Sequence, residues 1–438
     1  MPRESISLPF GSRNLEISLP PGWSPMDICA PAAYAGIKDA AVACREALAR
    51  PIGMPPLAEL ARGRKKITLV VDDISRPTPV LQFIEPVIEA LQQADVPNEA
   101  VTMLTALGIH RTMTQEEMES KIGAAALQRY RWVNHNMDPG PHLELLGRTG
   151  RGTEVWFNRL VTEADLVIGL GCIEPHIIAS FGGGRKIILP GVAGQKTVAA
   201  NHAINTTPAT FNNVGLDPDK NPMRQDLEEA VALLKPPLFI VNAVLRGDLS
   251  IARMVAGDAL QAHREGCRTC AEIYGVKIPE RADIIITSSH PMNHDLRQGL
   301  KAVANTIRAL KPGGAMLALV ACEKGIGDLS LPRRRLPISQ GMMRWVARGL
   351  IPLVGHFSMD MKEEDRFVAY FALQSMKNYR LFFYTPTLPP ELGERLPFLG
   401  LHNDLEAVLT STIKAAPQGR VLVFPNGGVS YPVIENSA

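Results

Sequence analysis

The sequence predicts an α/β fold, with two α/β domains, mainly parallel sheets and an interdomain cleft. The chain has 438 residues, which is longer than a single hydrophobic core usually supports. Short β-branched runs alternate with amphipathic helical patterns, and this alternation restarts in the second half. Continuous apolar strands that alternate with helices are typical of parallel sheets covered on both faces.

The first half contains four apolar runs that predict buried strands, at residues 66–72, 100–106, 165–170 and 238–244. Between the first two runs, an amphipathic pattern at residues 83–94 predicts a helix. After the second run, Thr114 is expected to open a helix, because Glu117 follows at the capping-box spacing. This order of elements predicts one parallel sheet for the first half.

The second half repeats the pattern and suggests a second domain. Strands are predicted at residues 283–288, 315–321, 378–385 and 420–424, and helices at 259–275, 296–310 and 404–415, the helix at 296–310 ending at Pro312, Gly313 and Gly314. We expect one domain at residues 1–272, another at 273–415, and a junction near 270–282. The last strand, about 416–438, is a candidate to return to the first domain. Segment 325–365 has no readable pattern.

The composition limits the classes of partner and compartment. Lys and Arg number 46 against 44 Asp and Glu, and this balance gives no reason to expect a nucleic acid or an anionic membrane as partner. Neither a secretory signal nor a run of roughly 18 apolar residues is found, so no membrane span is expected. The six scattered cysteines do not suggest a disulfide framework, and the cytoplasm is the expected location. Cys267 and Cys270 form a lone CxxC, which we interpret as helix packing rather than a metal site.

The first candidate motif is the loop that follows the strand at 66–72. Asp72 and Asp73 end that strand, and Ser75 and Arg76 precede a Pro-Thr-Pro turn. Because the prolines stiffen the loop, the Arg76 guanidinium would stand on a rigid support, suited to a carboxylate or a phosphate. A surface turn with its own Asp–Arg ion pair is an equal alternative.

A histidine, His110, follows the second strand and a glycine, just ahead of the helix expected at Thr114. The positive end of that helix dipole would favour a neutral imidazole, which suits a general base. A loop histidine that bonds a backbone carbonyl is the other interpretation.

The densest motif follows the strand at 165–170. Its residues of interest are Glu174, His176, Gly182, Gly183, Gly184, Arg185, Lys186 and, sixteen positions later, His202. Consecutive glycines let a backbone approach a ligand closely and present N–H groups to an anion. Lys186 could pair with a phosphate or act as a nucleophilic amine. The spacing fits neither the dinucleotide fingerprint nor a P-loop, and the apolar flanks disfavour a plain surface turn.

A fourth motif follows the strand at 283–288. Arg297, Gln298 and Lys301 stand at positions i, i+1 and i+4 of an expected helix, so they can share one side of it. They would offer one amide and two cations to a carboxylate, and a solvated helix face is the alternative. His290 and His294 lie nearby but make only a weak metal pair without a third ligand.

Taken together, the stretches DDISRPTP, GIHR, EPH, FGGGRK and NHAIN resemble the lactate racemase family. They occur in order between about residues 70 and 205, and a weaker likeness covers residues 297–301. The spacing of His176, Lys186 and His202 around the glycine run is the most specific part. The resemblance implies a racemase or epimerase of small 2-hydroxy acids that uses a nickel pincer nucleotide supplied by maturation proteins.

The resemblance also implies a role for each matching residue. Lys186 would carry the cofactor covalently, and His202 would complete a square-planar nickel site, a geometry that suits Ni(II). His110 and His176 would be the acid/base pair, one for each face of the substrate carbon, during reversible hydride transfer. Cofactor contacts map to Asp73, Ser75, Arg76, Gly183, Gly184 and Arg185, in the first domain. Substrate contacts map to Arg76, Gln298 and Lys301, so the second domain would contribute to the site.

Arg297 departs from the family pattern, because lactate-type members tend to carry an aromatic residue there. A second guanidinium favours a larger or second anionic group, so malate or a longer 2-hydroxy acid is expected over lactate. Three other interpretations stay open: a zinc hydrolase with three histidine ligands, a nicotinamide dehydrogenase, and a non-catalytic nucleotide-binding relative. The first leaves the glycine run unexplained, the second lacks its glycine fingerprint, and the intact set of His110, His176, Lys186 and His202 argues against the third.

Overall fold

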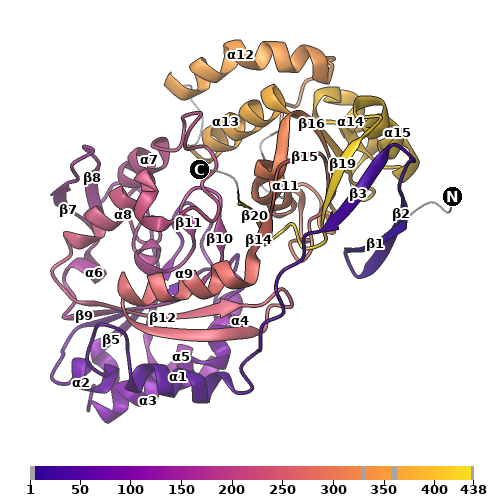
Figure 1. Ribbon diagram of the computed structural model, residues 1–438. Coiled ribbons are helices and arrows are strands. Elements are labelled where there is room, and N and C mark those ends of the chain that lie inside the picture. The colour runs from indigo at the N-terminus through magenta and orange to yellow at the C-terminus, as the bar shows by residue number, and fades with distance from the viewer. Residues whose placement is uncertain (1–4, 328, 330, 357–362, 436–438) are drawn as a thin grey trace.

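The computed structural model describes residues 5–327, 329, 331–356 and 363–435. Within them the chain forms two six-stranded sheets flanked by helices, which Figure 1 shows at the lower left and the upper right of the molecule. The predicted α/β class with mainly parallel sheets is confirmed. Part of segment 325–365 lies outside the described residues.

The first sheet has the strand order β13-β12-β9-β4-β5-β6, and only the β12–β13 pair is antiparallel. Its strands are β4 (Ile67–Asp72), β5 (Val101–Ala106), β6 (Arg131–Asn134), β9 (Leu166–Ile173), β12 (Leu238–Leu245) and β13 (Ile251–Asp258). The chain order reverses between β4 and β9. In open α/β sheets, ligands bind beyond the carboxyl ends of the strands at such a reversal.

Helices cover both faces of the first sheet. They are α1 (Ala40–Ala49), α2 (Leu57–Ala61), α3 (Ile84–Gln93), α4 (Gln115–Ile122), α5 (Ala124–Arg129), α6 (Arg159–Thr162), α7 (Gln195–Ala203), α8 (Pro222–Ala232) and α9 (Gln261–Tyr274). Short paired strands complete this half: β7 (Leu143–Arg148) with β8 (Glu154–Asn158), and β10 (Pro175–His176) with β11 (Ser180–Phe181). Side chains alternate across the sheet: Val71 packs with the α1 and α3 core, whereas Val70 packs with α7 and α8.

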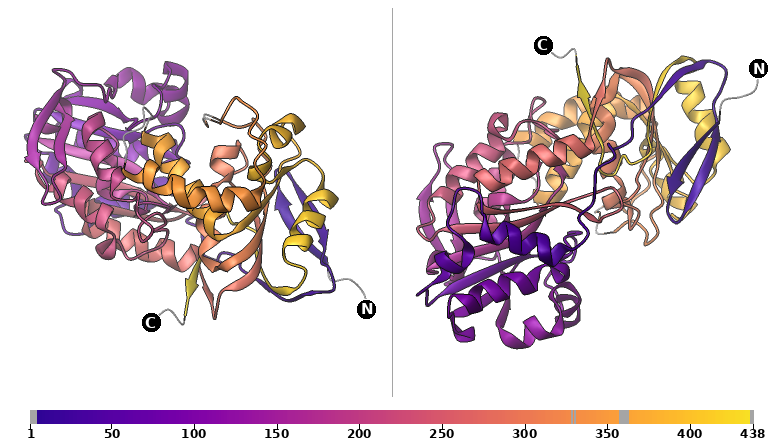
Figure 2. Two further views of the ribbon diagram at one scale, coloured as in Figure 1. Left: turned by 90° about the horizontal axis from the view of Figure 1, so that it is seen from above. Right: turned by 60° about the horizontal axis from the view of Figure 1, so that its bottom comes forward.

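The second sheet, of order β18-β17-β16-β15-β19-β3, is parallel throughout. Its strands are β3 (Trp23–Ile28), β15 (Ala282–Ser288), β16 (Leu310–Leu319), β17 (Arg380–Tyr384), β18 (Leu401–His402) and β19 (Gly419–Phe424). The other elements of this half are α10 (Leu296–Gly299), α11 (Lys301–Thr306), α12 (Gln340–His356), α13 (Glu363–Asn378), α14 (Pro390–Arg395) and α15 (Leu405–Ala415). A hairpin of β1 (Ser5–Phe10) and β2 (Arg13–Ser18) packs beside α15 on one face of this sheet (Figure 2).

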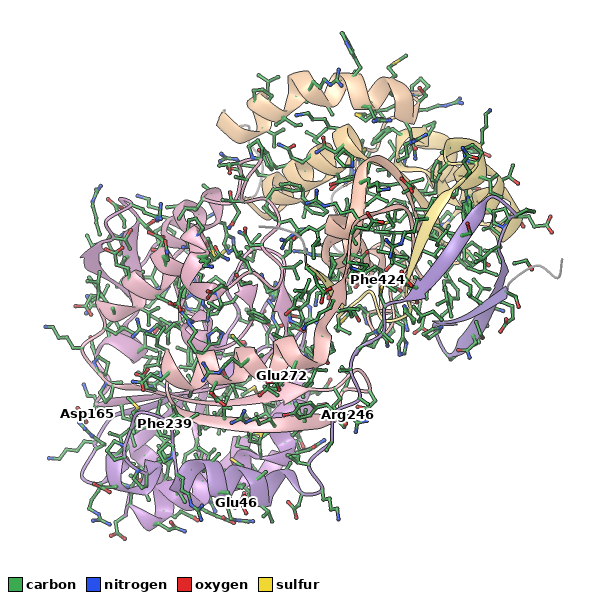
Figure 3. All side chains as sticks on the ribbon, viewed as in Figure 1. Glu46, Asp165, Phe239, Arg246, Glu272 and Phe424 are labelled. Atoms are coloured by element: carbon green, nitrogen blue, oxygen red, sulfur yellow. The ribbon has the colours of Figure 1, made fainter. Side chains whose placement is uncertain are left out.

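Each sheet has its own buried core. Phe239 lies fully buried on β12 of the first sheet and Phe424 fully buried on β19 of the second (Figure 3). A small parallel pair, β14 (Gly275–Ile278) with β20 (Tyr431–Ile434), follows α9 and brings the end of the described chain back beside it. Continuous apolar strands therefore end up covered on both faces, as their sequences require.

The sheet membership of two segments differs from the expectation. β3 pairs with β19, and β19 pairs with β15, so residues near the start of the chain and the last long strand both belong to the second sheet. Trp23 is anchored there, since its indole Nε1 donates to the carbonyl of Ala416 at 2.8 Å. An apolar run predicts a strand but does not specify its partner, and this is why residues 1–272 do not share one sheet.

The helix expected at 296–310 is also different. It is divided into α10, α11 and a 3₁₀ turn that ends at Ala309. Pro312 and the glycines after it lie inside β16 rather than at a helix end. The β15–β16 register is irregular between Ala282 and Ile284, and this irregularity accommodates the proline and glycines at the start of the strand.

Two sequence expectations concern membranes and cysteines. None of the described helices is long and apolar enough to cross a membrane. All six cysteines are buried and free. Cys267 and Cys270 lie on the buried side of α9, in agreement with their interpretation as helix packing.

Candidate active site

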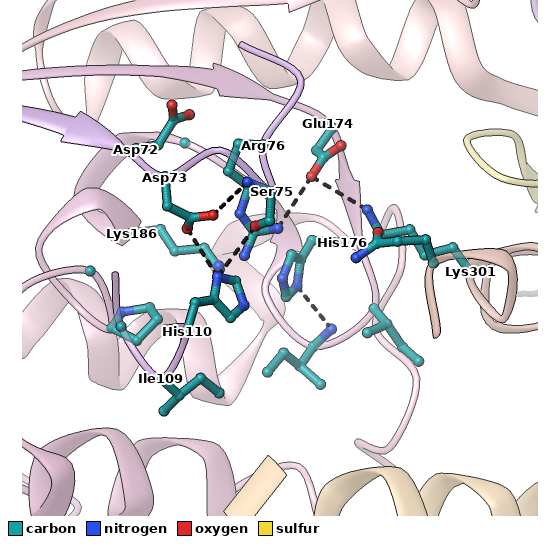
Figure 4. Close-up of a pocket in the computed structure, with 18 of the residues that line it drawn as sticks. Asp72, Asp73, Ser75, Arg76, Ile109, His110, Glu174, His176, Lys186 and Lys301 are labelled. Carbon is teal, nitrogen blue, oxygen red and sulfur yellow. Dashed lines mark hydrogen bonds and ion pairs between the residues drawn. The ribbon is translucent and has the colours of Figure 1, made fainter. Parts of the chain in front are cut away.

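A cavity of about 300 Å³ lies beyond the carboxyl ends of β4, β5 and β9. Residues from both halves of the chain line it, including Asp73 and His176 from the first sheet's loops and Lys301 from α11. Figure 4 shows these side chains converging from the two sides. The position matches the reversal point of the first sheet, so the fold itself brings the predicted loops together.

The loop after β4 is fixed by a buried lysine, Lys121, that no sequence motif indicates. Lys121 of α4 is 6% exposed, and its ammonium lies 2.9 Å from the Asp72 carboxylate. The same ammonium donates to the carbonyls of Asp73 at 3.1 Å and Arg76 at 3.0 Å. Thr78 donates a short hydrogen bond to Asp72. These bonds make the loop a rigid support for Arg76, as expected from the two prolines of the Pro-Thr-Pro turn.

Asp73 orients His110. The Nδ1 of His110 lies 2.9 Å from the Asp73 carboxylate, and Ser75 Oγ lies 3.3 Å from the same nitrogen. Nδ1–H therefore donates to Asp73, and a neutral ring keeps its lone pair on Nε2. Burial acts to raise the pKa of Asp73, but the hydrogen bond from His110, and the charge of that ring whenever it is protonated, outweigh burial and hold that pKa well below its usual range.

His176 is held the opposite way. Its Nδ1 accepts from the backbone N–H of Ile178 at 3.4 Å and of Ala179 at 3.3 Å, so a neutral ring carries its hydrogen on Nε2. Burial, with the nearby charges of Lys186 and Arg76, lowers the pKa of His176 well below the usual value. The two histidines therefore present different groups: His110 offers an acceptor and His176 a donor.

Glu174 connects the two halves of the cavity. Its carboxylate lies 3.5 Å from the Arg76 guanidinium and 3.9 Å from the Lys301 ammonium, as the dashed lines in Figure 4 mark. Burial acts to raise the pKa of Glu174, but Lys301 and Arg76 lower it overall, which keeps the carboxylate ionised. The sequence placed Glu174 beside His176 but gave it no role, because nothing local indicates a partner 127 positions away.

Lys186 and His202 both line the cavity, and neither side chain has a hydrogen-bond or ion-pair partner in the described part of the chain. Burial and the charge of Arg76 lower the pKa of Lys186 to about 7. Burial and the charge of Lys186 lower the pKa of His202 to about 3. A substantial fraction of the Lys186 amine is therefore neutral near pH 7, and the His202 imidazole is unprotonated at that pH.

The glycine run differs in part from the expectation. Gly183 and Gly184 have φ values of +72° and +61°, which side chains rarely adopt. The N–H of Gly182 donates to the Glu174 carbonyl and that of Gly184 to Asn242 Oδ1, so these two groups are not free for an anion. Gly184 and Arg185 do not line the cavity, and Arg185 donates to the Glu228 carbonyl instead. The glycine run therefore sets the course of the backbone, and neither the N–H groups of Gly182 and Gly184 nor the Arg185 guanidinium faces the cavity as an anion site.

The other side of the cavity comes from the second half of the chain. Arg297, Gln298 and Lys301 all line it, as their shared helix side predicted. Phe367 and Phe371 of α13 add an apolar wall, with ring centroids 6.4 Å apart. These rings were missed because they follow a segment whose sequence shows no clear pattern.

The three-histidine zinc interpretation is not supported. No group of three His, Cys, Asp or Glu side chains among the residues that the structure describes is arranged to hold a metal ion. His202 lines the same cavity as the Lys186 amine and could serve as a single protein ligand to a metal. A single imidazole ligand fits a metal whose other ligands belong to a bound cofactor rather than to protein side chains.

Comparisons with known proteins agree on one family. The family described as "Lactate racemase N-terminal domain" matches residues 10–212. Lactate racemase of Thermoanaerobacterium thermosaccharolyticum is 32% identical over 304 residues, covering 69% of this chain and 68% of that protein. Lactate racemase of Lactiplantibacillus plantarum is 32% identical over 287 residues, covering 64% and 66%.

Solved structures extend the likeness to the whole chain. The lactate racemase apoprotein from Thermoanaerobacterium thermosaccharolyticum superposes with a TM-score of 0.81 at 26% identity, covering 98% of this chain and 100% of that one. A Thermotoga maritima protein gives a TM-score of 0.64 at 17% identity, covering 90% and 97%, which shows a shared fold alone.

Proposed function

The chain belongs to the lactate racemase family, and from that premise we propose that it inverts the Cα centre of a 2-hydroxy acid with a nickel pincer nucleotide bound in the cavity. Membership makes it a racemase, an isomerase by class. The observation that carries the finer proposal is the pair of unpartnered groups, the Lys186 amine and the His202 imidazole, facing one cavity.

These residues fit the proposed cofactor. The partly neutral amine of Lys186 suits a covalent attachment, and the unprotonated imidazole of His202 suits a nickel ligand. At Gly183 a Cβ atom would come within 2.8 Å of Asn242 and Ile173, so only glycine leaves this backbone undisturbed. When bound, the nickel pincer nucleotide would supply a reversible hydride acceptor. Asp73, Ser75 and Arg76 border the same space and are proposed cofactor contacts.

We propose that His110 and His176 exchange the hydroxyl proton of the substrate, one on each face. His110 is prepared as the base by Asp73, and its Nε2 would take the proton as the Cα hydride leaves. His176 would be the acid from its imidazolium form, which a bound anionic substrate favours, and its Nε2–H would protonate the oxygen when the hydride returns to the other face, leaving the ring neutral. Because inversion leaves each histidine in the other's starting state, the pair must reset or serve the reverse reaction next.

We propose that the substrate is a dicarboxylate such as malate. Arg76, Arg297 and Lys301 are three cations, and Glu174 is one carboxylate that contacts two of them. Arg297 adds a guanidinium to the lining beside Arg76 and Lys301, and a second carboxylate of the substrate would suit it better than the methyl group of lactate. Gln298 would add an amide. Residues of both sheets contribute, and we propose that the two sheets mark two domains that exclude water from the reaction when they close.

The test uses the chain co-expressed with the family's cofactor-maturation proteins. Enantiomers of malate and of lactate, each deuterated at Cα, are incubated in ordinary water and followed by chiral chromatography with mass spectrometry. We expect racemisation with deuterium retained at Cα, because a returned hydride does not exchange with solvent, and a higher kcat/KM for malate. Loss of deuterium at the rate of racemisation would contradict hydride transfer. A preference for lactate would contradict the substrate.

A further inference from the structure

The glycine run that leads into Lys186 rests on buried polar side chains from three separate elements. Arg224 of α8, Asn242 of β12 and His263 of α9 are at most 2% exposed, and each bonds the backbone of residues 181–184. None of the three belongs to the motifs by which the sequence is recognised. Burying three polar side chains under one loop costs free energy unless each forms hydrogen bonds, and here the loop backbone supplies partners for all three.

Arg224 holds two loop carbonyls with a fully buried guanidinium. Its Nη1 donates to the carbonyl of Phe181 at 3.3 Å and its Nη2 to that of Gly183 at 3.2 Å. The charge is balanced behind the loop by Glu228, 2.8 Å from Nε. A planar fork reaches two acceptors at once, which an ammonium could not do with the same geometry.

His263 fixes the loop from beneath. Its Nε2 lies 2.9 Å from the Gly182 carbonyl, so this nitrogen carries the ring hydrogen and donates it. Arg224 Nη2 lies over the ring edge, 3.0 Å from Nδ1, which accepts from it, and 2.7 Å from Nε2. The ring is so close to Gly184 that a Cβ there would lie 2.6 Å from it. Burial and the charge of Arg224 lower the pKa of His263 well below the usual value, so the ring acts as a neutral donor and acceptor.

Asn242 completes the set from the sheet. Its Oδ1 accepts from the Gly184 N–H at 2.9 Å, and its Nδ2 donates to the Val241 carbonyl at 3.0 Å. The peptide groups of Gly182, Gly183 and Gly184 are therefore each fixed by a different buried side chain. The loop then passes directly into the 3₁₀ turn that carries Lys186, whose amine points into the cavity beside His110 and Asp73 (Figure 4).

We propose that Arg224, His263 and Asn242 are positioning residues that lock the glycine loop and thereby aim and desolvate the Lys186 amine. A loop with three consecutive glycines has large conformational freedom, and these bonds remove it before any ligand binds. The inference rests on the proposed function only in one respect, that Lys186 is the residue to which the cofactor becomes attached. The lock itself is a property of the chain without its cofactor.

The test measures the reactivity of Lys186 in the unloaded chain. Acetic anhydride at trace concentration labels lysines across pH 6 to 9, and peptide mass spectrometry reports Lys186 against the exposed Lys196 as an internal standard. In the wild type, labelling of Lys186 should titrate near pH 7. In His263→Leu and Asn242→Leu, the labelling of Lys186 should titrate at higher pH and should fall about tenfold or more at pH 7.5. Each unit by which the pKa of the amine rises lowers its neutral fraction about tenfold.

Matched variants separate positioning from general stability. Arg264→Ala removes a neighbour of His263 that shares Glu228 but does not contact the loop, and it should leave the Lys186 profile unchanged. His263→Gln keeps a donor and should restore most of the reactivity. Arg224→Lys keeps the charge but loses the fork, so a partial loss is expected. Thermal melting verifies that each variant is folded. If a leucine variant does not fold, the test becomes the comparison of Arg224→Lys, which should label Lys186 less than the wild type, with His263→Gln, which should label it almost as well.

Two results would overturn the inference. Folded variants of His263 or Asn242 that label Lys186 with the wild-type profile would show that the loop needs no lock. An equal change in Arg264→Ala would reduce the three side chains to ordinary core support. A wild-type chain whose Lys186 titrates as expected, yet never gains a cofactor when matured, would instead defeat the proposed function alone.

Discussion

Replacing Asp73 with Asn should disable His110 as a base while leaving the cavity nearly unchanged in shape. The Asp73 carboxylate accepts from His110 Nδ1 at 2.9 Å, and this contact places the free lone pair on Nε2. An asparagine amide can donate to Nδ1 instead, which moves the ring hydrogen to Nε2 and removes the acceptor. The same exchange in a Ser-His-Asp triad lowers kcat about 10⁴-fold for this reason.

We expect Asp73→Asn to lower kcat/KM by about 10³- to 10⁴-fold, equivalent to roughly 4–5.5 kcal/mol of transition-state stabilisation. Because the two enantiomers are equal in free energy, kcat/KM must fall equally in both directions, and chiral chromatography from each enantiomer measures this. Arg111→Ala is the control, since this neighbour of His110 is exposed and its guanidinium pairs with Glu117 rather than with the His110 ring. A loss below tenfold, or one no larger than that of Arg111→Ala, would refute the proposed orientation of His110.

Three further changes have distinct expected results. Arg297→Phe should lower kcat/KM for malate relative to lactate by about tenfold or more, measured with both substrates, and an unchanged ratio would remove Arg297 from specificity. His202→Ala should lose nickel but keep the mass attached at Lys186. In the wild type, nickel should stay bound well below pH 6.5, because the His202 imidazole has a pKa of about 3 and stays unprotonated until the pH falls toward that value. Asp226→Ala should cost roughly 2–4 kcal/mol in urea unfolding, because its fully buried carboxylate accepts from two threonines and an asparagine, whereas exposed Glu99→Ala should cost little.

The sequence predicted most of the cavity because its loops share a physical constraint. Parallel strands end at one edge of a sheet, so the loops after β4, β5 and β9 had to meet once the strands were identified. Apolar runs and the Thr114 capping box located those elements to within a few residues. The family likeness rested on the same loops, and the comparisons confirm it.

What the sequence did not predict depends on contacts between distant residues. Glu174 meets Lys301 across the cavity, and Arg224 reaches a loop 41 positions earlier, and no local pattern encodes either contact. Arg185 looked like part of the glycine run but points to Glu228, because a 3₁₀ turn sends adjacent side chains in different directions. Strand β3 likewise finds its partner, β19, almost 400 residues later.

The attachment of the cofactor at Lys186 is tested most directly by intact mass. The chain is co-expressed with the maturation proteins, purified, and analysed by mass spectrometry together with Lys186→Ala prepared in the same way. We predict that the active wild-type chain carries an added mass of several hundred daltons with nickel, located on the peptide of Lys186, and that Lys186→Ala carries neither the mass nor activity. A wild-type chain that racemises its substrate at its unmodified mass would contradict the account.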